Sequence, residues 1–209
     1  MKARTAVATL AAVIALAACS GGPAGGAFGS DSYAYVSAKT VNVGDGSMTV
    51  TPDKPWNRQR RLLWEDVRQV EDWTQNGPLL DDITFVTGLK DRKSLIRQNS
   101  RDAQQVPLFR SNMTAPEIAS LIESAYRVRG GAVSFETLSL APRNFLGANG
   151  FQLDYQHLDG DEVWRKGRAV GAVIDGRLYL VMLDSVRSHY FGSTIGDFEK
   201  LVASARLQR

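Results

Sequence analysis

Short runs of alternating apolar and polar residues, separated by turn signals, dominate the chain from residue 33 onward. In the segment that starts at Phe151, apolar side chains recur at every second position, which is the period of a strand with one buried face. Residues 178–183 are apolar without alternation and predict a central strand covered on both faces. The predicted strands are 39–43, 47–51, 67–74, 83–87, 132–138, 150–157, 162–174 and 177–184.

Turn signals indicate how these strands connect. Gly44-Asp45-Gly46 predicts a hairpin between the first two strands, and Asn76-Gly77-Pro78 predicts a turn before 83–87. Asp159-Gly160 and Asp175-Gly176 are two-residue hairpin signals, because glycine accepts the positive φ that tight turns need.

Two segments are less regular. In 62–74, Leu63, Val67 and Val70 recur at helical spacing, so strand and helix both remain open, although the turn that follows favours a strand over 67–74. Residues 90–106 are polar and irregular, which predicts a long surface excursion.

Apolar stripes of helical period predict two helices. In the first, 114–127, Thr114 and Glu117 have the spacing of a capping box, and Gly130-Gly131 ends the pattern. The second covers 195–206, with Thr194 as its N-cap. The order of hairpin, strands, helix, four strands and helix predicts an α+β fold, an antiparallel sheet with two helices packed on it.

Residues 1–18 combine a short cationic start with an uncharged, largely apolar run, and they predict a signal peptide. The run ends in Leu16, Ala17, Ala18 and Cys19, which resemble the lipobox of bacterial lipoproteins. The resemblance implies that the first three are recognised during processing and that Cys19 receives lipid. The alternative is an ordinary cleavage site that leaves Cys19 as an unmodified thiol.

The chain that follows the signal divides into two parts. Residues 19–32 form a lipid anchor and a flexible linker in this interpretation. The lipobox resemblance implies the anchor at Cys19, and the abundance of glycine and serine after it predicts the linker. We expect 33–209 to form a single α+β globular domain. By the same resemblance to lipoproteins, Ser20 implies the periplasmic face of the outer membrane, with the inner membrane as the alternative.

Charge and cysteine content exclude several classes of function. The chain has 25 basic and 22 acidic residues, and removal of 1–18 with Lys2 and Arg4 leaves 23 against 22. Such a balance lacks the positive field that nucleic-acid binding needs. Cys19 is the only cysteine, which excludes an intramolecular disulfide, a cysteine-based zinc site and a dithiol redox pair. We expect no cofactor and no metal.

His157 and His189 are the only histidines. His157 ends the apolar face that starts at Phe151, which favours a hydrogen-bonded structural residue over a catalytic base. His189 lies beside Tyr190 in a loop before the last helix, where either function or plugging of the sheet edge explains it. Because no nucleophile elbow or metal spacing accompanies them, we assign no catalytic residue.

Trp56, Trp64 and Trp73 lie within eighteen residues of one another. Clustered indoles form platforms for sugars or peptides, although tryptophans more often pack in a core. These three residues, with His189 and Tyr190, are the candidate binding residues.

The C-terminal half is similar to the α/β sandwich of the PsbP type. The matching segments are the strand 150–156, the strand through Gly167 and Gly171, the strand 175–183 and the helix 198–207. Proteins of this type are commonly binding or assembly factors, so the resemblance implies a module that is not an enzyme.

Three functions follow from these observations. The favoured hypothesis is a lipid-anchored, non-catalytic envelope module that binds a partner protein or envelope component. The second is a carrier of a small apolar ligand between sheet and helices. The third is an envelope hydrolase that uses His189 or His157 with a nearby carboxylate.

Overall fold

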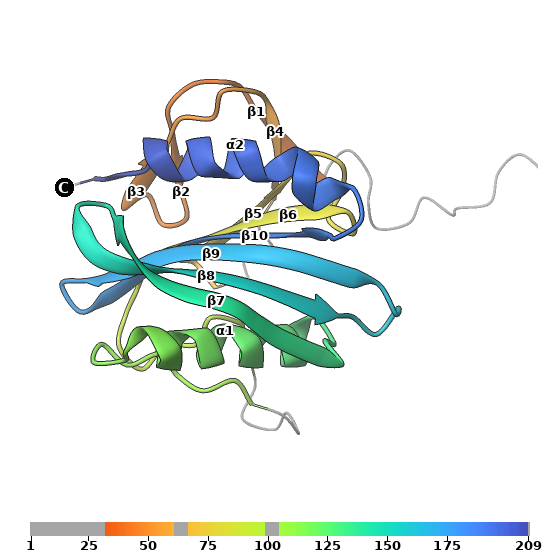
Figure 1. Ribbon diagram of the computed structural model, residues 1–209. Coiled ribbons are helices and arrows are strands. Elements are labelled where there is room, and N and C mark those ends of the chain that lie inside the picture. The colour runs from red at the N-terminus through yellow and green to blue at the C-terminus, as the bar shows by residue number, and fades with distance from the viewer. Residues whose placement is uncertain (1–31, 61–66, 99–104, 209) are drawn as a thin grey trace, which may run out of the picture. The chain divides into compact units, whose positions relative to one another are not determined.

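The computed structural model describes residues 32–60, 67–98 and 105–208. Its centre is an eight-stranded sheet in which all neighbouring strands are antiparallel (Figure 1). In spatial order the strands are β1 (Tyr33–Val36), β4 (Trp56–Gln59), β5 (Val70–Thr74), β6 (Asp81–Leu89), β10 (Arg177–Val186), β9 (Trp164–Ile174), β8 (Ala148–Leu158) and β7 (Ser134–Phe145). The expected α+β class with a large antiparallel sheet is confirmed.

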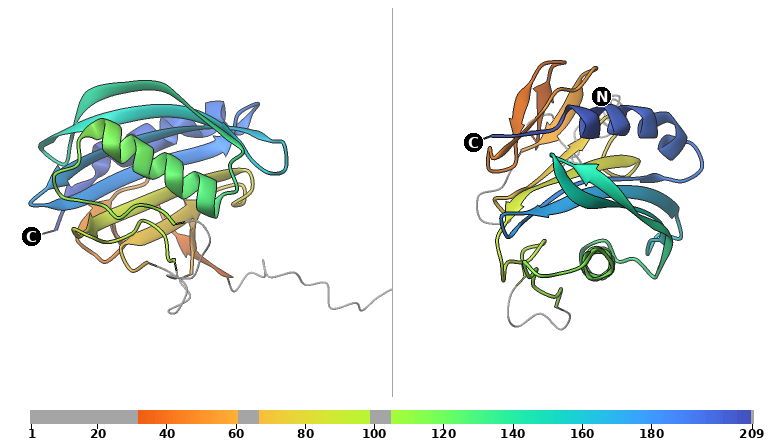
Figure 2. Two further views of the ribbon diagram at one scale, coloured as in Figure 1. Left: turned by 90° about the horizontal axis from the view of Figure 1, so that it is seen from below. Right: turned by 60° about the vertical axis from the view of Figure 1, so that its left-hand side comes forward.

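One helix covers each face of this sheet (Figures 1 and 2). The helix α1 (Ala115–Arg129) lies on one face, and α2 (Tyr190–Ser204) lies on the other beside a small sheet. That sheet has the order β11 (Arg206–Leu207), β3 (Met48–Val50) and β2 (Val41–Val43). Among the described residues, no helix combines the length and apolar character needed to cross a membrane.

The two faces of the sheet bury separate hydrophobic clusters. Trp56, Trp73 and Phe85 pack with residues of α2 such as Phe198 on one side. Ile118, Leu121 and Ile122 of α1 pack on the other side against β8, β9 and β10. The central strand β10 contributes to both clusters, because its side chains are buried at both parities. The expectation of a doubly covered strand at 178–183 is therefore confirmed.

Several local predictions are confirmed by the strand pairing. The hairpin around Gly44-Asp45-Gly46 is present as β2 and β3, and β5 and β6 pair across the turn at Asn76-Gly77-Pro78. The strand interpretation of 67–74 is thus correct for Val70–Thr74, while 61–66 lie outside the described residues. Asp175 and Gly176 both have positive φ, as a two-residue hairpin requires.

The turn between β8 and β9 differs from the prediction. The strands separate after the pair Leu158 and Trp164, so the connection has five residues, 159–163. Glu162, and not Gly160, adopts the positive φ, of 62°. Backbone hydrogen bonds from Glu162 N–H to the Asp159 carbonyl and from Asp159 N–H to the Val163 carbonyl close the loop.

The strand β7 is longer than the predicted 132–138. It continues through Pro142 to Phe145 and turns at Leu146-Gly147 into β8. A proline is compatible with this strand because β7 is the edge of the sheet, where one side of the backbone has no partner strand. The proline had obscured the strand in the sequence pattern.

Both ends of the last helix differ from the predicted 195–206. The helix begins at Tyr190 with His189 as its N-cap, and Thr194, the expected cap, is a buried residue inside it. At the other end, Arg206 and Leu207 leave the helix and pair with β3. In the first helix the capping interaction is present, since the Glu117 carboxylate accepts hydrogen bonds from the backbone N–H and the hydroxyl of Thr114.

Candidate functional site

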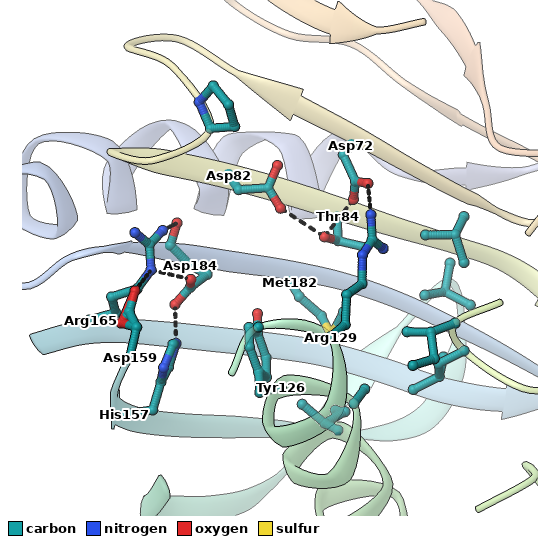
Figure 3. Close-up of a pocket in the computed structure, with 18 of the residues that line it drawn as sticks. Asp72, Asp82, Thr84, Tyr126, Arg129, His157, Asp159, Arg165, Met182 and Asp184 are labelled. Atoms are coloured by element: carbon teal, nitrogen blue, oxygen red, sulfur yellow. Dashed lines mark hydrogen bonds and ion pairs between the residues drawn. The ribbon is translucent and has the colours of Figure 1, made fainter. Parts of the chain in front are cut away.

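A row of polar side chains crosses five strands on the face of the sheet that α1 covers (Figure 3). Cross-strand register sets the row, because His157 of β8 lies opposite Arg165 of β9 and Asp184 of β10 lies opposite Asp82 of β6. Asp72 of β5 lies opposite Thr84, two residues after Asp82. Alternation along each strand then directs all of these side chains to one face.

One end of the row is a buried, hydrogen-bonded network. The His157 Nε2 atom lies 3.0 Å from Asp184 Oδ1, and the Arg165 Nε–H donates to Asp184 Oδ2 at 2.5 Å. Arg165 also donates to the Leu79 carbonyl at 2.8 Å. Burial alone would lower the pKa of Arg165, but the charge of Asp184 raises it above its usual value. The guanidinium of Arg165 therefore stays protonated.

The other end of the row is acidic and only partly compensated. The Thr84 hydroxyl donates to Asp72 Oδ1 at 2.7 Å and lies 3.0 Å from Asp82 Oδ2. Arg129, at the end of α1, reaches Asp72 Oδ2 at 3.5 Å. Among the described residues no cation forms an ion pair with Asp82. Burial, together with the neighbouring charge of Asp72, raises the pKa of Asp82 well above its usual value.

A cavity of about 440 Å³ lies between this row and α1. Its volume is within the range of small-molecule sites. Charged side chains line one part of it, and apolar side chains line the rest. The apolar lining includes Val70, Pro78, Leu79, Val86, Leu95, Ile96, Ile122, Ala125 and Met182.

Two residues that line the cavity also carry buried polar atoms without a hydrogen-bond partner among the described residues. His157 is 2% exposed and lines the cavity, and its Nδ1 atom has no hydrogen-bond partner among the described residues. The same is true of Asp159 Oδ1. Within the described ranges, no group of three or more histidine, cysteine, aspartate and glutamate side chains is arranged to hold a metal ion. The cavity therefore combines an apolar wall with charged and polar side chains at one end.

The tryptophans proposed as a binding platform are not at the surface. Trp56 is 1% exposed and Trp73 is fully buried. The Trp73 ring packs 4.8 Å from Phe85, and its Nε1–H donates to Glu71 Oε1 at 2.7 Å. These two side chains are part of the core on the α2 face, and neither lines the cavity. The binding role expected of them is corrected to core packing.

Other sequence-predicted residues have different outcomes. Trp64 and the stretch from Leu16 to Cys19 lie outside the described residues. His189 is exposed at the start of α2, where its ring meets Tyr190 edge to face at 5.2 Å. Neither His189 nor Tyr190 lines the cavity. His157 does, and the prediction of a buried, hydrogen-bonded histidine is confirmed.

The acidic residues of the cavity had only a weak signal in the sequence. Asp82 belongs to the pair Asp81-Asp82, whose members point to opposite faces as expected of neighbours on a strand. The Asp81 carboxylate binds the turn after β5, whereas Asp82 lines the cavity. Asp184 directly follows the apolar run 178–183, and a lone acid in a doubly buried strand is the clearest signal for such a network.

No protein-family model and no curated protein sequence matches this chain. Among solved structures, the chain is similar to the cyanobacterial PsbP protein (CyanoP) of Synechocystis, with 17% identity, a TM-score of 0.53, and coverage of 90% of this chain and 100% of that one. A Pseudomonas aeruginosa protein of unknown function shares 14% identity over 74% of this chain and 93% of its own, with a TM-score of 0.40.

LpqN of Mycobacterium tuberculosis, involved in cell envelope biogenesis, shares 9% identity over 85% of this chain and 92% of its own, with a TM-score of 0.34. The likeness to CyanoP covers more than the C-terminal half from which the sandwich was expected. At 17% identity it concerns the fold alone. The chain therefore has a PsbP-like fold.

Proposed function

We propose that this protein is a lipid-anchored, non-catalytic binding module of the bacterial cell envelope that holds a small amphiphilic ligand in the cavity beneath α1. The cavity carries the proposal, because it joins an apolar wall to a charged end within one volume of about 440 Å³. Small-molecule sites have this combination, in which apolar surface provides affinity and a few polar groups fix orientation. This favours a small ligand over the partner protein of the first hypothesis.

The envelope location rests on the sequence pattern. The run ending in Leu16-Ala17-Ala18-Cys19 supports lipid attachment at Cys19, and the glycine-rich stretch 19–32 supports a tether. Several acyl chains on one cysteine would hold the protein firmly, because each buried methylene contributes about 0.8 kcal/mol. We place the domain on the periplasmic side of the outer membrane, with the inner membrane as the alternative.

Native mass spectrometry of the protein purified from its own envelope tests this function. The expected result is a ligand-bound species of defined added mass, released on denaturation. Ala125→Phe adds volume from α1 directly into the cavity and should abolish the added mass while the melting temperature stays close to that of the wild type. Gly192→Ala, where an added Cβ meets nothing within 4 Å, is the matched control. Equal added mass in both variants would refute the cavity as the site.

A hydrolase that uses His157 is the second candidate, favoured by its 3.0 Å contact with Asp184 inside the cavity. Such a dyad orients imidazoles in hydrolases. Among the described residues, however, no serine, threonine or cysteine hydrogen-bonds the ring, whose Nδ1 has no partner. Hydrolysis of p-nitrophenyl butyrate by the wild type, lost in His157→Gln, would support this candidate. Equal background rates in both would exclude it for such esters.

A further inference from the structure

We infer that the ligand of this cavity is an organic cation, an ammonium group on an apolar body, whose charged end is bound by Asp82. This inference rests on the proposed function and names the class of ligand. Three features carry it: the acidic side chains of the lining outnumber the basic ones, Asp82 has no ion-pair partner among the described residues, and the polar lining is rich in hydrogen-bond acceptors.

The acidic side chains of the cavity lining outnumber the basic ones. Its acids are four aspartates and its bases are two arginines. Arg165 is committed to Asp184 at 2.5 Å and lies 3.8 Å from Asp159, and Arg129 lies 3.5 Å from Asp72. Asp82 is the acid that this distribution leaves without a counterion among the described residues.

Asp82 lies among other acids. It is the direct cross-strand partner of Asp184, and Asp72 shares with it the hydroxyl of Thr84. Like charges opposite each other on a sheet are unfavourable, and the partly buried carboxylate of Asp82, which has no counterion among the described residues, loses part of its hydration. A ligand cation at this position removes both penalties, since an opposite charge within hydrogen-bond distance favours the ionised carboxylate.

The polar lining of the cavity is rich in hydrogen-bond acceptors, because it contains four aspartates. The Nε2 atom of His157 lies 3.0 Å from Asp184 Oδ1, which leaves Nδ1 as the second nitrogen of the ring. Nδ1 is buried without a partner among the described residues, and so is Asp159 Oδ1. An ammonium group has three N–H donors and no acceptor, which complements such a lining. A carboxylate or phosphate group brings only acceptors and further negative charge.

The apolar wall provides room for the rest of the ligand. Ile122 and Ala125 of α1 line the cavity from one side, and Val86 and Met182 line it from the sheet. An alkyl chain that leads away from the ammonium group would contact these side chains. The ligand is therefore expected to be an amphiphile, and not the wholly apolar molecule of the carrier hypothesis.

Isothermal titration calorimetry with three probes of equal chain length tests the inference: octylamine, octanol and octanoate at pH 7.5. The full chain with Cys19→Ala is used, so that no lipid is attached. Octylamine should bind more tightly than either other probe. Asp82→Asn should weaken octylamine binding about 10- to 100-fold, the effect of removing a charged hydrogen-bond partner. Asp53→Asn, an exposed acid paired with Lys200 and absent from the cavity lining, is the matched control and should change nothing.

Proton release gives a second readout that a purely structural change would not produce. Because the ligand cation favours the ionised form of Asp82, binding should become tighter as the pH rises toward the raised pKa of Asp82, and below that pKa it should release a proton. Titrations in two buffers of different ionisation enthalpy measure this release. It should be lost in Asp82→Asn and retained in Asp53→Asn.

The outcomes separate the inference from the proposed function. If octanol or octanoate binds as tightly as octylamine and Ala125→Phe blocks it, the cavity is a binding site and the cation inference is wrong. If none of the three probes binds, both the inference and the proposed small-ligand function are overturned. Octylamine binding that is unchanged in Asp82→Asn would also overturn the inference.

Discussion

Asp82→Asn should stabilise the protein without any ligand present. The substitution keeps the shape of the side chain and its contact with the Thr84 hydroxyl, which lies 3.0 Å from Asp82 Oδ2. It removes a carboxylate that stands opposite Asp184 in the β6–β10 ladder and close to Asp72. Burial and the charge of Asp72 raise the pKa of Asp82 well above its usual value, so the ionised form is disfavoured in the folded state.

The sign and size of the effect follow from this shift. Because the folded state holds the Asp82 proton more tightly than the unfolded state, wild-type stability falls as the pH rises from the usual aspartate pKa toward the raised one. A tenfold difference in the proton affinity of Asp82 between the folded and unfolded states corresponds to about 1.4 kcal/mol of unfolding free energy. The asparagine variant does not titrate there, so its advantage should be near zero at low pH, increase through that window and then stay constant.

Urea denaturation of the wild type, Asp82→Asn and Asp53→Asn between pH 4.5 and 8 measures the free energy of unfolding in each case. The expected result is a difference between wild type and Asp82→Asn that increases with pH and has no counterpart in Asp53→Asn. An asparagine variant that is less stable than the wild type at pH 8 would show that the fold itself stabilises the Asp82 carboxylate. The unpaired acid would then no longer point to a ligand.

Three further predictions concern other parts of the chain. Arg165→Met breaks the buried pair with Asp184 and should lower the free energy of unfolding by about 3–5 kcal/mol in urea denaturation, whereas a loss below 1 kcal/mol would contradict the network. Gly167→Ala places a Cβ 2.1 Å from the Tyr155 ring, which hydrogen bonds to Tyr126 and to the Leu183 carbonyl hold in place. The substitution should lower the free energy of unfolding by about 1–3 kcal/mol in thermal or urea denaturation, whereas Gly192→Ala should leave it unchanged. Cys19→Ala should abolish metabolic labelling with a palmitate analogue, and equal label in both proteins would remove the anchor.

The sequence predicted the parts of the fold whose signal is local. The alternation of Phe151, Leu153 and Tyr155 and the capping pair Thr114 and Glu117 depend on neighbours within a few residues. The predictions of secondary structure were wrong where contact with a distant segment of the chain determines the local conformation. Arg206 and Leu207 have an acceptable helical pattern, but they pair with β3, which is more than 150 residues away.

The candidate site was harder to predict for the same reason. The register of β5, β6 and β10 brings together Asp72, Asp82 and Asp184. The spacing of residues within each strand does not predict this register. Arg129 reaches Asp72 from the end of a helix that no local pattern places over this face. Conversely, the clustering of Trp56 and Trp73 in sequence suggested a binding platform as one interpretation, although both rings lie in the core.

Methyl NMR of the isotope-labelled full chain with Cys19→Ala, titrated with octylamine, tests most directly whether the cavity binds a cationic amphiphile. The methyl signals of Val86, Ile122 and Met182, which line the cavity, should shift saturably. Those of Val50 and Leu201, in the cluster on the opposite face, should stay unchanged. Shifts confined to the α2 face, or no saturable shift at all, would contradict the account.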